Sequence, residues 1–159
     1  MVEGVLSGHP RNNGQEEKVS SKESFFGLER YAVIGDSRTR KFPALTQRYL
    51  EERGKTVYPV DLAGGQPGFL SSVSEIPTDA QAAVLEVAPE RSADVVRQAL
   101  DHGLTEIWMH QMTDTPEALE LCRMQGASLQ SGGCAVMYLA PTSSFHVLHR
   151  SIWKLIGRY

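Results

Sequence analysis

A loop whose residue types suit a phosphate follows the first apolar run of the chain. It reads Gly35-Asp36-Ser37-Arg38-Thr39-Arg40-Lys41 and leads into a segment that Pro43 opens as a helix. Backbone N–H groups at a helix N-terminus, with a glycine, a hydroxyl group and three cations beside them, favour phosphate binding. One glycine falls short of the G-x-G-x-x-G fingerprint of dinucleotide sites, so a polar loop with exposed cations is an equal alternative. The candidate contacts in this loop are Gly35, Asp36, Ser37, Arg38 and Lys41.

The ends of three further predicted strands supply the other candidate contacts. Asp61 ends the second strand, where dinucleotide folds place a carboxylate that accepts hydrogen bonds from the adenosine ribose. A solvated loop residue is the alternative for this position. Val60 and the turn Val87-Ala88-Pro89 suit an apolar wall against adenine, and they are equally compatible with ordinary packing. His110, with Gln111 next to it, follows the fourth strand and completes the candidate set.

Cysteine and histidine side chains carry the remaining chemistry. Two glycines precede Cys134 and no cation is adjacent to it, so we predict an inert, buried or half-buried thiol in preference to a nucleophile. His146 and His149 fall on one face of a predicted helix, and His110 could join them at the strand ends. A metal site needs three or four ligands close together, and nothing in the sequence brings these histidines together, so no metal site is predicted. No spacing indicates a catalytic triad, a P-loop or a catalytic carboxylate pair.

Five apolar runs predict the strands that must position these residues. Each run is short and is bounded by turn residues, as in buried strands. The predicted strands are Tyr31–Ile34, Thr56–Val60, Ala82–Val87, Ile107–Met109 and one near Ser128–Leu129.

Helices are predicted between these strands, each opened by a proline and closed by a glycine. The pairs are Pro43 with Gly54, Pro89 with Gly103, and Pro116 with Gly126. Residues 61–72 contain three glycines and one proline, which favours a loop or one helical turn. A last helix, with Phe145 and Ile156 on its apolar face, is predicted to cover the sheet.

This alternation of strands and helices predicts the fold class. Parallel strands need long crossover connections, so we expect an α/β fold with a Rossmann-like doubly wound parallel sheet of about five strands. Residues 24–159 would form this single domain, and residues 1–23 a flexible N-terminal arm. Ligands of such sheets bind outside the carboxyl ends of the strands, where the strand order reverses. The candidate contacts all fall in loops at that edge.

The composition predicts one soluble globular domain. The chain has 159 residues, of which 41% are hydrophobic and 22% are charged. Its net charge of −3 gives no drive toward nucleic acid or an anionic membrane, and neither is expected as a partner. Cys122 and Cys134 cannot form a disulfide framework and no signal peptide is apparent, so a reducing cytoplasm is the expected location.

The charge is unevenly distributed along the chain. No Asp or Glu follows Glu120, so the last 39 residues carry +4 while the first 120 carry −7. The basic residues of this C-terminal segment are Arg123, Arg150, Lys154 and Arg158. The segment would serve as a docking face for a protein partner or an anion, or would form a solvated basic helix face.

Several short motifs occur in one order between Ser24 and Ala135. They are Val33-Ile34-Gly35-x-Ser37, Tyr49-Leu50-x-Glu52-x-Gly54-x-x-Val57-Tyr58-Pro59-Val60, Val73-x-x-Ile76-Pro77, Val87-x-Pro89, Gly103-x-x-x-x-Trp108, Glu117-Ala118, and Gly126 followed by Cys134. Together they resemble the small stand-alone CoA-binding domain proteins, which are related to the nucleotide-binding domain of succinyl-CoA synthetase alpha chains. The resemblance implies a nucleotide-binding module for CoA or an acyl-CoA, without catalysis of its own.

The chain departs from the pattern of the family it resembles at three ligand positions. Asp36 stands where the family has Ala, Asp61 where it often has Asn, and His110 where it has Gln. Asp61 favours NAD-type dinucleotide binding as an alternative. The departures are also compatible with a ligand-free regulatory or interaction protein that retains the fold, and with a small enzyme that uses His110 or Cys134 beside a nucleotide. Ligase activity is not expected, since the phosphorylated histidine of the synthetases lies in a second domain.

Overall fold

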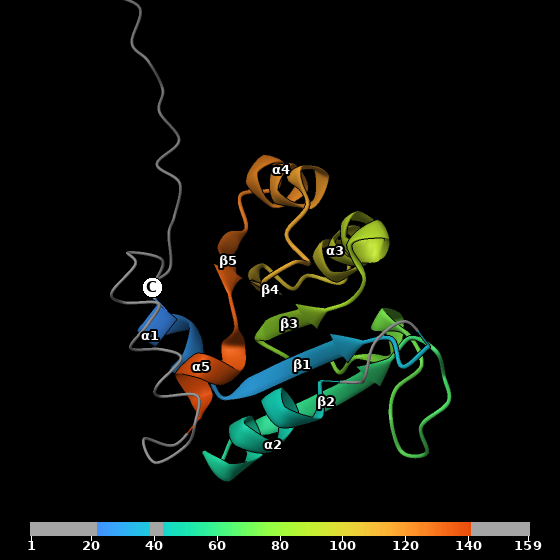
Figure 1. Cartoon of the computed structure of the whole chain (residues 1–159), viewed down its shortest axis with the longest axis vertical. Helices are drawn as coiled ribbons and strands as arrows, with labels where there is room; N and C mark the ends of the chain where they lie inside the picture. The colour runs from blue at the N-terminus through green and yellow to red at the C-terminus, as the bar shows by residue number, and fades with distance from the viewer. Residues whose placement is uncertain (1–21, 39–42, 141–159) are drawn as a thin grey trace, which may run out of the picture.

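A five-stranded parallel sheet forms the centre of the molecule (Figure 1). The computed structural model describes residues 22–38 and 43–140, and its strand order is β2-β1-β3-β4-β5. The strands are β1 (Arg30–Gly35), β2 (Thr56–Asp61), β3 (Ala82–Glu86), β4 (Glu106–His110) and β5 (Ser128–Gly133). All four neighbouring pairs are parallel. This confirms the predicted α/β class and the Rossmann-like doubly wound sheet in a single domain.

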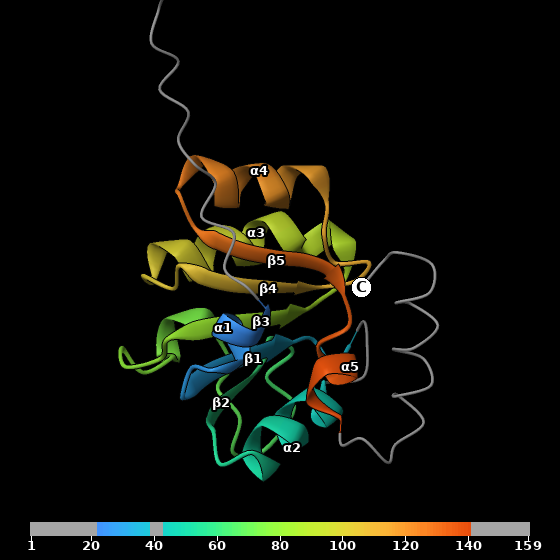
Figure 2. The same cartoon turned by 90° about the vertical axis from the view of Figure 1, so that its left-hand side faces the viewer.

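Helices cover both faces of the sheet (Figure 2). On one face lie α3 (Pro89–Asp101), α4 (Pro116–Met124) and the short 3₁₀ helix η1 (Val73–Glu75). The opposite face is covered by α1 (Lys22–Phe26), α2 (Ala44–Glu52) and α5 (Ala135–Leu139). The proline and glycine signals locate α2, α3 and α4 correctly, although Pro43 is the residue before α2 and not part of its first turn.

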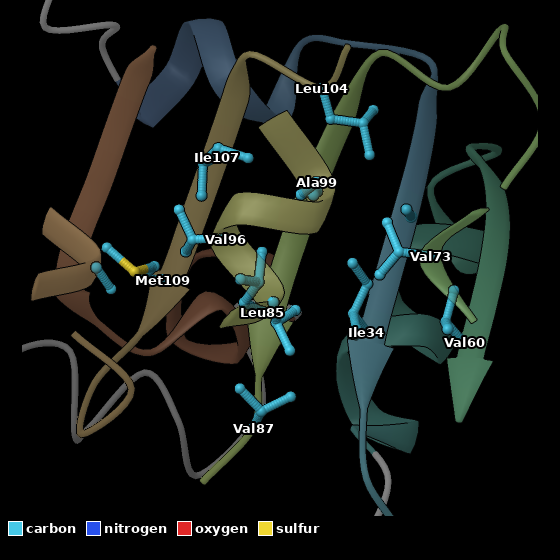
Figure 3. Close-up of a cluster of buried hydrophobic side chains, with 14 of the residues drawn as sticks. Ile34, Val60, Val73, Leu85, Val87, Val96, Ala99, Leu104, Ile107 and Met109 are labelled. Atoms are coloured by element: carbon cyan, nitrogen blue, oxygen red, sulfur yellow. The ribbon is translucent and has the colours of Figure 1, made fainter. Parts of the chain in front are cut away.

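Alternate residues of each strand face opposite helical layers. In β1, Ala32 and Ile34 pack toward α3 and α4, whereas Tyr31 and Val33 pack toward α1, α2 and α5. Figure 3 shows the first of these two cores, in which α3 contributes its apolar residues against the sheet. Strands that are buried on both faces appear in sequence as continuous apolar runs, which is why these runs predicted the sheet.

Three elements differ from the predictions. β5 continues to Gly133, beyond the predicted Ser128–Leu129, because His110 of β4 pairs with Gly133 after an irregularity in the ladder. The five-residue helices α1 and α5 were not predicted. Lys22 and Glu23 belong to α1, whereas the sequence placed them in the N-terminal arm.

Some predictions concern residues outside the described ranges. These are the N-terminal arm before Lys22, Thr39, Arg40 and Lys41 of the first loop, and the helix near Phe145–Ile156 with His146 and His149. They stay predictions. Within residues 22–38 and 43–140, no helix has the length and apolar character needed to cross a bilayer.

Phe25 connects α1 to the core and provides a test of that contact. Its ring is fully buried, and its centroid lies 5.5 Å from that of Trp108 and 5.8 Å from that of Tyr31. Phe25→Ala should lower the free energy of unfolding by about 3 to 5 kcal/mol, the range for large cavity-forming changes. The control Leu45→Ala, at an exposed position of α2, should cost about 1 kcal/mol or less. Urea denaturation measures both, and equal losses would show that α1 is not part of the core.

Candidate functional site

The candidate residues meet at the carboxyl edge of β1, β2 and β3. Gly35 is in register with Asp61 on one side and with Glu86 on the other. After β1 the chain continues to α2 on one face, and after β3 it continues to α3 on the other face. This divergence of neighbouring strands is the switch point at which doubly wound sheets bind ligands. The structure therefore brings together the loop after Gly35, the end of β2 and the start of α3.

Asp61 is fully buried and is held by the loop after β1. Its Oδ1 accepts hydrogen bonds from the backbone N–H of Ser37 at 2.9 Å and of Ala63 at 3.1 Å, and its Oδ2 accepts from the Ser37 hydroxyl at 2.8 Å. Burial opposes ionisation, but these bonds and the N–H of Gly65 outweigh it and hold the pKa of Asp61 below its ordinary 3.8. The predicted contact of Asp61 with a ribose does not fit this geometry, because the carboxylate has no exposed surface.

Asp36 is the second buried carboxylate of the site. It is 1% exposed and accepts hydrogen bonds from the backbone N–H of Arg38 at 3.0 Å and from its guanidinium at 3.2 and 3.3 Å. Arg91, in the first turn of α3, forms an ion pair with Oδ2 of the same carboxylate. The hydrogen bond from the Arg38 guanidinium is the main reason why the pKa of Asp36 is lowered, although burial alone would raise it. The sequence analysis named Arg38 as a candidate contact of this loop and missed Arg91, which is 55 residues from Asp36 along the chain.

The two arginines keep their outer surfaces in solvent. The side chain of Arg38 is 66% exposed and that of Arg91 is 32% exposed, whereas Asp36 between them is covered. The Arg38 guanidinium also donates to the carbonyl of Leu62 at 3.3 Å, which places it over the loop after β2. Cationic groups therefore face outward at the switch point, and their counter-charge lies beneath them.

Of the two alternatives left open for the apolar candidates, the structure matches ordinary packing. Val60 and Val87 lie at the expected strand ends, but both side chains are fully buried in the core (Figure 3). They support the loops from below and offer no wall to an adenine ring. Pro89 is exposed at the first position of α3, and Gly35 is buried at the end of β1.

His110 forms a pair with Cys134 at the end of β4. Its Nδ1 lies 2.9 Å from the carbonyl oxygen of Gln111. Burial opposes protonation, but the interaction of the imidazole with Cys134 and the charge of Glu86 outweigh it and raise the pKa of His110. Sequence reasoning missed this pair because Cys134 had no cation next to it along the chain.

A metal site would need at least three His, Cys, Asp or Glu side chains close together. Residues 22–38 and 43–140 contain no such group.

Residues 29–140 match the CoA binding domain family. The chain belongs to this family. The match covers all five strands and all the described candidate residues, and it confirms the resemblance drawn from the sequence motifs. No curated protein sequence matches the chain.

Solved structures share the fold of this CoA-binding domain. A conserved hypothetical protein from Pyrococcus furiosus is 22% identical with a TM-score of 0.60, covering 70% of this chain and 99% of its own. A hypothetical protein from Pyrococcus horikoshii is 23% identical with a TM-score of 0.63, covering 83% and 94%. A protein from Thermus thermophilus is 15% identical with a TM-score of 0.60, covering 82% and 95%. At these identities the likeness shows the fold alone.

The buried Asp61 predicts a pH-dependent contribution to stability. Because its pKa is lower in the folded protein than in the unfolded chain, the contribution is present above the unfolded value and is lost as the pH falls through the folded one. Asp61→Asn should cost about 1.5 to 3 kcal/mol at pH 7, and this difference from the wild type should shrink below about pH 4.

Urea denaturation at pH 7 and at pH 3 to 4 measures the effect. Asp79→Asn is a matched control, since Asp79 is an exposed carboxylate, and its cost should stay within about 0.5 kcal/mol at both pH values. A cost for Asp61→Asn that is small at pH 7, or that does not change with pH, would contradict the assignment of Asp61 as an ionised anchor.

Proposed function

We propose that this protein is a nucleotide-binding module that binds CoA or an acyl-CoA at the carboxyl edge of its sheet, without catalysis of its own. Membership of the CoA binding domain family carries this proposal. The switch point between β1 and β3 lies within the matched residues and supplies the place. The reducing cytoplasm, expected from the cysteine usage, belongs to the same proposal.

Outward-facing cations support the diphosphate end of this ligand. Arg38 and Arg91 stand on the two sides of the switch point, one in the loop after β1 and one in α3. Guanidinium groups bind phosphate oxygens through charge-assisted, often bidentate hydrogen bonds. We propose that both contact the diphosphate beside Gly35, Asp36 and Ser37, with Lys41 as a predicted third cation.

The remaining candidate residues surround this position. Pro89 is exposed beside Arg91 and would contact the adenosine, while the buried Val60, Asp61 and Val87 hold the loops beneath it. His110 would meet the ligand at the end of β4. NAD is not proposed, because it rested on an accessible Asp61 carboxylate, and that carboxylate is buried and occupied by Ser37 and Ala63.

A ligand-free regulatory protein is the second candidate, and one observation favours it. The backbone N–H groups of Ser37 and Arg38, which the sequence offered to a phosphate, donate to Asp61 and Asp36 instead. In this alternative a protein partner would dock on the basic C-terminal segment, and three of its four basic residues lie outside the described residues. Changing Arg150, Lys154 and Arg158 together to Gln should then abolish the binding of such a partner.

Isothermal titration with CoA, acetyl-CoA, NAD and ADP tests the first proposal. CoA should bind below the millimolar range, and more tightly than NAD. Arg38→Gln and Arg91→Gln should each weaken CoA about tenfold or more, since each removes one charge-assisted contact with phosphate. Thermal unfolding should accompany each titration, because Arg91 also pairs with Asp36.

Arg97→Gln is the matched control for these titrations, since Arg97 lies on the same helix with its side chain exposed and pairs with residues of the helical surface. It should leave the dissociation constant of CoA unchanged. The absence of any nucleotide binding below the millimolar range would overturn the proposal and favour the ligand-free alternative. An equal effect of Arg38, Arg91 and Arg97 would place the ligand elsewhere.

A further inference from the structure

Three reactive side chains lie at the ends of adjacent strands, beside the switch point. Glu86 ends β3, His110 ends β4, and Cys134 directly follows β5. Leu85 is in register with Met109, so Glu86 and His110, the next residues of the two strands, are level with each other. His110 in turn pairs with Gly133, which places Cys134 one residue beyond it. The strand register therefore brings a carboxylate, an imidazole and a thiol into one row.

The hydrogen bond of the His110 imidazole leaves its second nitrogen available as a base. A carbonyl oxygen can only accept a hydrogen bond, so the contact of Nδ1 with the Gln111 carbonyl places the proton of the neutral ring on Nδ1. Nε2 is then the unprotonated nitrogen of the ring, and Cys134 is the thiol whose interaction with the ring raises the pKa of His110. An imidazole that accepts the proton of a neighbouring thiol generates a thiolate, which is the nucleophile.

Glu86 stabilises the protonated form of this imidazole. Its carboxylate accepts a hydrogen bond from Thr46, which is buried in α2, and its charge favours the imidazolium of His110. Glu86 is therefore a positioning residue that acts through His110. His110, Cys134 and Glu86 are all half-buried, so the row is partly open to solvent.

The backbone around the pair is fixed on both sides. The N–H of Gln111 donates to the carbonyl of Gly133 at 3.0 Å, which joins the loop after β4 to the residue before Cys134. Met112, next in this loop, has a positive φ of 68° and an exposed side chain. A residue other than glycine in this conformation persists only where its surroundings hold it, and such residues cluster at functional sites.

We propose that Cys134 is a nucleophilic thiol that exchanges with the disulfide form of CoA, with His110 as its general base. Nε2 of His110 takes the thiol proton, and the Cys134 thiolate attacks one sulfur of CoA disulfide. A new S–S bond joins Cys134 to one CoA, and the S–S bond between the two CoA units breaks. The second CoA leaves as a thiolate and takes the proton from the His110 imidazolium. One disulfide replaces another, so no further oxidant or reductant is needed.

The choice of CoA disulfide rests on the proposed function. A bound CoA carries one thiol, and the disulfide of that thiol is the electrophile a cysteine attacks. Because Glu86 is in register with Gly35, the row of reactive side chains begins at the same strand ends as the proposed diphosphate contacts. This proposal gives Cys134 a reversible covalent role, whereas the sequence predicted an inert thiol.

The rate of adduct formation, followed by intact mass at pH 7, tests this inference. With CoA disulfide the wild type should gain the mass of one CoA, and Cys134→Ser should gain none. His110→Gln should slow the reaction about tenfold or more, because the variant has no base to take the proton of the attacking thiol. Glutathione disulfide should react at least about tenfold more slowly than CoA disulfide, since it lacks the nucleotide.

Two matched controls are available within the chain. Cys122→Ser should react as fast as the wild type, since burial raises the pKa of the Cys122 thiol to about 11. His102→Gln removes another half-buried histidine, which bonds the carbonyl of Ile76 at 2.8 Å, and it too should keep the wild-type rate. Thermal unfolding of each variant separates loss of fold from loss of the base.

The outcomes distinguish this inference from the proposed function. If CoA binds in the titration but Cys134 reacts no faster than an unstructured cysteine peptide, or equally fast in His110→Gln, the nucleophile is refuted and CoA binding stands. If glutathione disulfide and CoA disulfide react at the same His110-dependent rate, the thiol–imidazole pair stands and CoA as its substrate is refuted.

Discussion

The hydrogen bonds between Asp61 and Ser37 hold the carboxyl edge of the sheet together. A buried carboxylate is tolerated only if its oxygens accept hydrogen bonds. The donors to Asp61 come from the loop after β1 and from the loop after β2. Asp61 therefore links the ends of β1 and β2. Asp36 extends the same constraint across the switch point through Arg91 of α3. With these loop donors occupied by the protein's own carboxylates, charge-assisted contacts from exposed arginines become the means of holding a phosphate.

Most of the sheet could be predicted because local signals and global fold agree. The strands appear as continuous apolar runs because helices cover both faces of the sheet. Proline and glycine mark the ends of the helices, as at Gly103, which follows α3 with a φ of +92°. The helices α1 and α5 were not predicted because a five-residue helix has little intrinsic stability and depends on packing against the sheet. The end of β5 was not predicted because Ser131-Gly132-Gly133 has low strand propensity and becomes a strand only by pairing with β4.

The candidate site was located more accurately than its side chains were oriented. Parallel strands place all their carboxyl ends at one edge, so the positions of Gly35, Asp61 and His110 followed from the strand assignment alone. Whether Asp61 points to solvent or into the protein depends on donors in another loop, which no local pattern reveals. Arg91 and the pairing of Cys134 with His110 were missed for a similar reason, because each residue meets its partner only through the order and register of the strands.

The position of Cys134 is set by the core as much as by the edge. The carbonyl of Gly133 accepts a hydrogen bond from the indole N–H of the buried Trp108 at 3.3 Å, in addition to the one from Gln111. A Cβ at Gly133 would lie 3.4 Å from both Trp108 and Tyr138, at the lower limit of ordinary van der Waals contact, so the chain passes close to the two rings at this residue. Because close-packed interiors change shape little, this contact with the aromatic core restricts the backbone position of Gly133 and of the next residue, Cys134. The pairing of His110 with Cys134 therefore depends on the same packing that stabilises the fold.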